Sequence, residues 1–168
     1  MMATAADVMD YLRGNRTEFK ILTHPPFASK RDMASSKGIP PEEVADVLTL
    51  RADKWFVMTV IPAGTRISEQ TLCDLLHAKE LSDVSEWDLE RLFPTCEIKS
   101  VAPFGHLFGV PVVVDASFER IGRIVFPACS RTISLMMEWR DYQRLVHPTV
   151  AEIVEADQVA RAVAALGV

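Results

Sequence analysis

The sequence predicts a mixed α/β fold in which a sheet is surrounded by helices. Segments with a helical spacing of apolar residues are interspersed with short β-rich segments, without the strict strand–helix alternation of a parallel α/β fold. The chain has 168 residues and 49% of them are hydrophobic, which is enough for one domain with its own core and short for two. We therefore expect a single domain over residues 1–168.

Helices are predicted where apolar residues recur every three or four positions between recognisable ends. Ser29 and Ser85 are expected N-caps, and Pro148 is suited to the first position of a final helix. The expected helices cover residues 3–13, 29–37, a segment that begins at 68, 85–92, 138–146 and 149–166.

Strands are predicted where β-branched and aromatic residues cluster between turn residues. The turn Arg51-Ala52-Asp53-Lys54 joins two of these segments into a hairpin. The expected strands cover residues 19–23, 44–50, 55–61, 110–115, 122–127 and 131–135.

The charge of the chain excludes one class of function. The net charge is −5 at pH 7, so the molecule as a whole does not attract nucleic acid. Lys30, Arg31 and Lys37 nevertheless cluster on the predicted helix after His24. A solvated helix face is the commoner explanation of such a cluster, and an RNA-contact patch is the functional one.

The cysteines and the chain start indicate a cytoplasmic protein. Cys73, Cys96 and Cys129 are odd in number, widely spaced and without a CxxC pair, which argues against a disulfide scaffold or a zinc site and for a reducing compartment. Cys96 and Cys129 are expected to be buried structural thiols. The first 15 residues lack the apolar run of a signal peptide, and no stretch approaches transmembrane length, so no membrane contact is expected.

The four histidines are isolated, so neither a metal site nor a cofactor is expected. His24 is placed between a strand and two prolines, where pockets often form. No catalytic partner stands at a recognisable spacing, and a core-edge histidine held by one hydrogen bond is the commoner interpretation.

The segment from 96 to 115 is the predicted centre of the site. Its first part contains Pro103, Gly105, Gly109 and Pro111 among apolar residues, which is typical of a loop packed at the mouth of a pocket. Its last part is a predicted buried strand.

Motifs along most of the chain stand in the order that a known family shows. They are His24-Pro25, Val44-Ala45-Asp46-Val47-Leu48, Val60-Ile61-Pro62, Leu92-Phe93-Pro94-Thr95-Cys96-Glu97, Val101-Ala102-Pro103-Phe104-Gly105, Gly109-Val110-Pro111, Val114-Asp115 and Leu145-Val146-His147-Pro148-Thr149-Val150-Ala151. From about residue 5 to 153, the chain resembles the YbaK/prolyl-tRNA-synthetase-associated editing domain family.

The resemblance implies a compact α/β domain with a curved, barrel-like mixed sheet. It also implies an aminoacyl-tRNA hydrolase that removes a mischarged small amino acid, and its partners would be a tRNA acceptor end and an aminoacyl-tRNA synthetase. In the family a lysine of the strand motif contacts the substrate, and a glycine-to-proline loop fixes the ester carbonyl. Much of the catalysis is attributed to a hydroxyl of the RNA and to bound water.

The chain departs from the family pattern at the site itself. The motif lysine falls on Asp46, the first loop glycine falls on Lys99, and an Ala-Gly-Thr/Ser-His segment reads Ala128-Cys129-Ser130-Arg131. Asp46 and Lys99 are therefore the expected catalytic positions in altered form. The other residues expected in the pocket are His24, Ser100, Ala102, Pro103, Phe104, Gly105, Cys129, Ser130 and Arg131.

A buried aspartate is costly alone and tolerable when paired, so we expect Asp46 to form an ion pair with Lys99 or Arg131. Two functions stay open. One is a deacylase with altered substrate choice, and a free cation in an open pocket would favour it. The other is an inactive relative that binds RNA, a nucleotide or a protein, and a pocket filled by Lys99 and Phe104 would favour that. Three residues expected around the pocket are small, namely Ala28, Ala102 and Ala128, and they favour an alanyl or cysteinyl group.

Overall fold

The computed structural model describes residues 4–27, 29–94 and 96–155, and this part of the chain contains two sheets. The strands of the larger sheet are, in spatial order, β4 (Leu81–Asp83), β2 (Ala45–Ala52), β3 (Trp55–Pro62), β5 (Val112–Asp115) and β8 (Thr149–Ala151). Those of the smaller sheet are β1 (Lys20–Thr23), β7 (Ile133–Glu138) and β6 (Arg123–Pro127). The mixed α/β prediction is confirmed, whereas the hydrogen bonding shows two sheets in place of one barrel-like sheet.

The hairpin of β2 and β3 is the framework of the larger sheet. Its two strands pair antiparallel from Ala45 opposite Pro62 to Ala52 opposite Trp55, as the turn sequence predicts. β5 then pairs parallel with β3, and β8 pairs parallel with β5. A parallel bridge between Val44 and Val125 connects this framework to β6 of the smaller sheet.

Most of the α-helices begin at polar residues that cap them. The side chains of Thr4, Ser29, Ser68 and Ser85 each accept a hydrogen bond from the backbone N–H three residues further on. The helices are α1 (Ala5–Gly14), α2 (Lys30–Lys37), α3 (Glu69–Leu76), α4 (Glu86–Leu92), α5 (Ser117–Ile121) and α6 (Trp139–Val146), with 3-10 helices η1 (Pro41–Glu43) and η2 (Gly105–Phe108). Within the described residues, none of the helices is long and apolar enough to cross a membrane.

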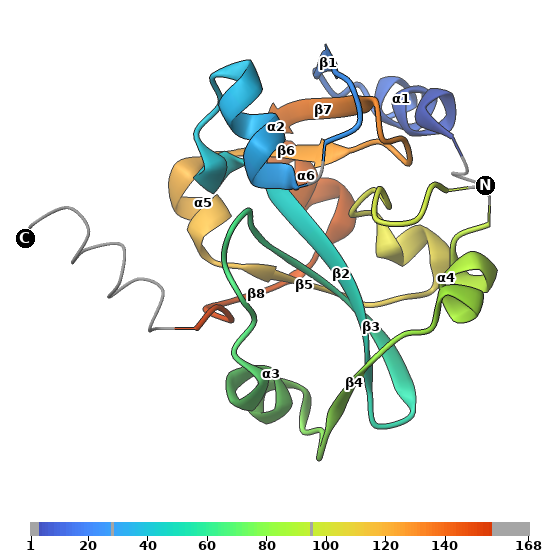
Figure 1. The fold of residues 1–168 in the computed structure, drawn as a ribbon, viewed down its shortest axis with the longest axis vertical. Helices are drawn as coiled ribbons and strands as arrows, with labels where there is room; N and C mark the ends of the chain where they lie inside the picture. The colour runs from blue at the N-terminus through green and yellow to red at the C-terminus, as the bar shows by residue number, and fades with distance from the viewer. Residues whose placement is uncertain (1–3, 28, 95, 156–168) are drawn as a thin grey trace, which may run out of the picture.

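Figure 1 shows the long β2–β3 hairpin running through the molecule. The smaller sheet, α1 and α2 lie at one end of the hairpin, and α3 and β4 lie at the other. The prediction of a helix over 149–166 is wrong for its first residues, because Thr149–Ala151 forms strand β8, which pairs with β5. The rest of that predicted helix, from residue 156 on, lies outside the described residues.

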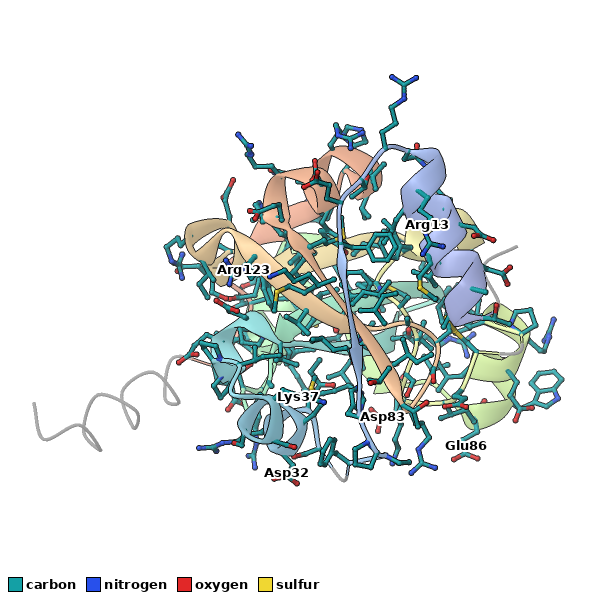
Figure 2. All side chains as sticks on the ribbon, turned by 90° about the horizontal axis from the view of Figure 1, so that it is seen from above. Arg13, Asp32, Lys37, Asp83, Glu86 and Arg123 are labelled. Carbon is teal, nitrogen blue, oxygen red and sulfur yellow. A yellow bond between two sulfur atoms is a disulfide. The ribbon has the colours of Figure 1, made fainter. Side chains whose placement is uncertain are left out.

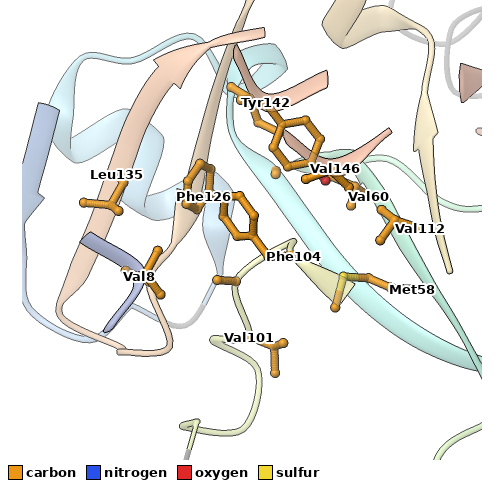
Figure 3. Close-up of a cluster of buried hydrophobic side chains, with 14 of the residues drawn as sticks. Val8, Met58, Val60, Val101, Phe104, Val112, Phe126, Leu135, Tyr142 and Val146 are labelled. Carbon is orange, nitrogen blue, oxygen red and sulfur yellow. The ribbon is translucent and has the colours of Figure 1, made fainter. Parts of the chain in front are cut away.

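The main core holds the loop before η2 in place. Phe104 is fully buried, and its ring makes edge-on contacts with Tyr11, Phe126 and Tyr142 at centroid distances of 5.7, 5.4 and 5.7 Å. Figure 3 shows Phe104 beside Phe126 within this cluster. The buried Tyr142 hydroxyl donates to the Pro103 carbonyl at 2.7 Å, and burial raises the pKa of this phenol. The predicted pocket loop is thus anchored in the core at its C-terminal end.

Candidate functional site

Two loops meet at the predicted site and are joined covalently. Cys96, in the loop after α4, forms a disulfide with Cys129, in the loop between β6 and β7. The Glu97 N–H donates to the Cys129 carbonyl at 3.3 Å, and the Glu97 carboxylate accepts from the Arg131 N–H. The prediction of two buried free thiols is therefore wrong, because a separation of 33 residues gave no sign that folding brings these loops together. The cytoplasmic location stays a prediction.

Both positions that the resemblance equates with glycine have a left-handed backbone. The φ angle is 68° at Lys99 and 57° at Cys129. This conformation costs a residue other than glycine about 1–2 kcal/mol, so the loops keep the backbone shape that glycine favours. Lys99 itself is exposed, and Phe104 is packed in the core, so neither of the two side chains proposed to fill the pocket does so.

Lys30 brings an amine to the same loop. It is the first residue of α2, and its Nζ donates to the Lys99 carbonyl oxygen at 3.0 Å. Burial lowers the pKa of Lys30, and the nearby Asp46 carboxylate opposes this shift. In turn, burial raises the pKa of Asp46, and the Lys30 ammonium opposes that shift. Lys30, predicted only as an RNA contact, thus lies at the site beside Asp46.

The expected ion pair of Asp46 is not formed. Among the described residues, the ion pairs within 4.0 Å include Asp46 with neither Lys99 nor Arg131. The cation that acts on its charge is Lys30. Lys99 and Arg131 were proposed as partners because the resemblance placed both of them at the pocket. The sequence did hold one signal: Lys30 and Arg31 are the two cations at the start of the predicted helix that precedes the Asp46 strand.

His24 has a serine partner that the sequence did not reveal. Its Nδ1 lies 3.0 Å from the Pro25 carbonyl oxygen, and its Nε2 lies 2.9 Å from the Ser134 hydroxyl oxygen. A carbonyl oxygen only accepts, so we assign the ring proton to Nδ1, and in the neutral ring Nε2 then accepts from Ser134. Ser134 is 2% exposed, which fits a buried hydroxyl that needs an acceptor better than an accessible nucleophile.

The residues from Ser100 to Gly105 are buried, and some of them have a packing role. A methyl group on Gly105 would lie 2.7 Å from the Val110 carbonyl oxygen. Glycine at this position therefore allows the backbone at 105 to pack closely against the backbone at Val110. Ser100 and Ala102 are each 2% exposed, and Ala102 belongs to the main core. The loop therefore presents mainly backbone groups to the site.

The remaining predicted residues lie at the rim. Arg131 is exposed, and Ser130 is half-buried, with its hydroxyl accepting from the Thr132 N–H at 3.2 Å within the loop. On α2, Arg31 and Lys37 are both exposed, and Figure 2 labels Lys37 near Asp32 of the same helix. These cations stay predictions as RNA contacts.

Two surface hollows are lined by other described residues, although the second reaches Ile61, the cross-strand partner of Asp46. One, of about 570 Å³, is lined by residues of α1, β1, β6 and β7, among them Arg13 and Arg123, which Figure 2 labels. The other, of about 390 Å³, lies along β2 near β4. None of the residues that line either hollow was predicted for the site. Among the described residues, no group of three or more histidine, cysteine or acidic side chains could hold a metal ion.

The fold and the paired loops define an α/β domain with a small polar site at the junction of two sheets. The sequence profile described as "Aminoacyl-tRNA editing domain" matches residues 24–145, and the chain belongs to this family. The matched range includes Lys30, Asp46, Lys99 and Cys129. No curated protein matches the chain in sequence.

Solved structures share the fold. One of a candidate trans-editing enzyme for prolyl-tRNA synthetase has a TM-score of 0.78 at 16% identity, covering 90% of this chain and 97% of that chain. A hypothetical protein has a TM-score of 0.78 at 15% identity, covering 88% and 99%. A candidate signal transduction protein from Marinobacter aquaeolei has a TM-score of 0.68 at 13% identity, and the match covers 88% of this chain and 30% of that one.

Proposed function

We propose that this protein is a trans-editing aminoacyl-tRNA deacylase, which hydrolyses the ester bond between a small mischarged amino acid and tRNA. The observation that carries the proposal is the backbone of the loop pair. Lys99 and Cys129 hold the left-handed conformation at the two positions equated with glycine, and the Lys99 side chain is exposed. Both positions therefore keep a backbone conformation that glycine favours, which supports a loop that can still meet the ester.

The loop also offers hydrogen-bond donors for an ester carbonyl. The backbone N–H groups of Val101 and Ala102 have no acceptor within the described residues, although these residues are 9% and 2% exposed. Buried N–H groups normally have a partner, and consecutive free N–H groups can stabilise the oxyanion of ester hydrolysis. The attacking group would come from water or from the RNA, with the loop holding the carbonyl.

The test is a deacylation assay with a panel of mischarged tRNAs that includes alanyl and cysteinyl esters. We expect release of a small amino acid by the wild-type protein. Asp46→Lys and Lys99→Gly restore the residues of the family pattern, separately and together. Lys54→Gly, in the exposed hairpin turn, is the matched control and should leave the rate unchanged.

One specific observation favours a second function. Asp46 places a carboxylate where the resemblance expects a phosphate-facing amine, and this would suit an inactive relative that binds a ligand through the same site. If wild type releases no amino acid from any tRNA while the Asp46→Lys, Lys99→Gly double variant does, the natural protein has lost the activity. In that case the binding function is the correct one.

A further inference from the structure

Asp46 lies on the face of β2 opposite the main core. Ala45 and Val47 pack in that core, so strand alternation turns Asp46 to the other face, which it shares with Val44 and Leu48. Val44 is covered by Met33 of α2 and is fully buried, whereas Leu48 is 40% exposed. Asp46 therefore lies between the covered Val44 and the exposed Leu48, and it is itself half-buried.

The carboxylate of Asp46 has unused hydrogen-bonding capacity. Within the part of the chain that the structure describes, no hydrogen bond and no ion pair within 4.0 Å reaches it. The Lys30 ammonium has three donors, and the Lys99 carbonyl accepts one of them. Lys30 and Asp46 are close enough for each to act on the charge of the other, but they form no ion pair within 4.0 Å among the described residues.

A stabilising role explains this arrangement poorly. Removing a charge from water is costly, and direct contact with a partner is what offsets the cost. Burial opposes the charged form of both Lys30 and Asp46, so each charge by itself works against folding at neutral pH. A half-buried cation and anion held apart instead match a ligand that carries both an anionic or carbonyl oxygen and an ammonium group.

We propose that Asp46 binds the α-ammonium group of an aminoacyl ester and that Lys30 binds an oxygen of the same ligand. The inference rests on the proposed function and adds the substrate class: acyl groups with a free, protonated α-amine, in preference to N-acylated ones. In an aminoacyl ester the ammonium group and the carbonyl group are joined through a single carbon, the Cα, so one small ligand can meet both charges. Asp46 is thus the specificity-determining residue of the site.

The experiment measures binding of two stable ligands by isothermal titration calorimetry. One is adenosine that carries an alanyl group through a 3′-amide, with a free α-amine, and the other is its N-acetylated form. We expect wild type to bind the free amine at least about tenfold more tightly, the range of a charge-assisted hydrogen bond. Asp46→Asn should bring the two affinities within about twofold, and Asp46→Glu should restore part of the preference. Lys30→Met should weaken binding of both ligands.

The control is Asp32→Asn, which removes an exposed carboxylate from α2 and should keep the full preference. Equal binding of the two ligands by wild type, or binding of neither, would overturn the inference without any variant. A preference that survives in Asp46→Asn would overturn it as well. If the ligands are discriminated but no mischarged tRNA is hydrolysed, the deacylase proposal fails and this inference stands.

Discussion

The disulfide between Cys96 and Cys129 gives the sharpest test of the structure. It closes a loop with a sequence separation of 33 residues, and both ends lie in loops that line the site. In the chain-entropy description, such a crosslink restricts the unfolded chain and stabilises the fold by about 3–4 kcal/mol. For a chain of this length, a change of that size shifts the melting temperature by roughly 10 °C.

The assay is urea unfolding followed by tryptophan fluorescence, with and without excess dithiothreitol. Reduction, or the Cys96→Ser, Cys129→Ser double variant, should lower the free energy of unfolding by about 3–4 kcal/mol. Cys73→Ser is the matched control, because Cys73 is the free, half-buried cysteine and should change stability little. Thiol labelling of the denatured, unreduced protein should count one thiol, and three after reduction.

The prediction is refuted in two ways. Three thiols in the freshly purified, unreduced protein would show that the bond is absent. A reductant effect of the same size in the double variant would show that the stability change has another source. The result also bears on location, because a persistent disulfide is rare in the reducing cytosol.

Three further substitutions test the segment from Lys99 to Gly105 and the contact that holds it, and two others serve as controls. Gly105→Ala should lower the free energy of unfolding in urea by about 1–3 kcal/mol, because its methyl group would lie 2.7 Å from a backbone carbonyl oxygen. The control Gly14→Ala places its methyl group where no atom lies within 4 Å, so it should leave the stability unchanged or raise it. Tyr142→Phe should cost about 1–3 kcal/mol by leaving the buried Pro103 carbonyl without its donor, and a loss well below 1 kcal/mol would contradict that bond. Lys99→Gly should stabilise by up to about 1 kcal/mol by relieving the left-handed strain, and an equal gain in Lys99→Ala would exclude strain as the cause.

Local sequence signals placed several elements accurately. The Ser29 cap and Gly38 bound α2 because each satisfies backbone groups at a helix end through nearby atoms. The β2–β3 hairpin followed from two β-rich segments around a short turn. α5 and β4 were missed, because elements of five and three residues are too short to show a period.

The site was predicted less completely, for a physical reason. The loop around Lys99 could be located from its prolines and glycines and from the resemblance, whereas its left-handed backbone at Lys99 is known only from the structure. The partner of Asp46 could not, because it depends on how α2 packs across the strand. That packing involves Met33 and Val44, which are distant from the loop in sequence.

The sequence by itself determined the family, the hairpin, the capped helices and the loop that forms the site, because short-range signals and ordered motifs encode them. Only the tertiary structure decided that the strands form two sheets, that Cys96 bonds to Cys129 and that Lys30 is the cation beside Asp46. These three features share one cause. Each depends on contacts between segments far apart in the chain, and such contacts form only when the whole core is packed.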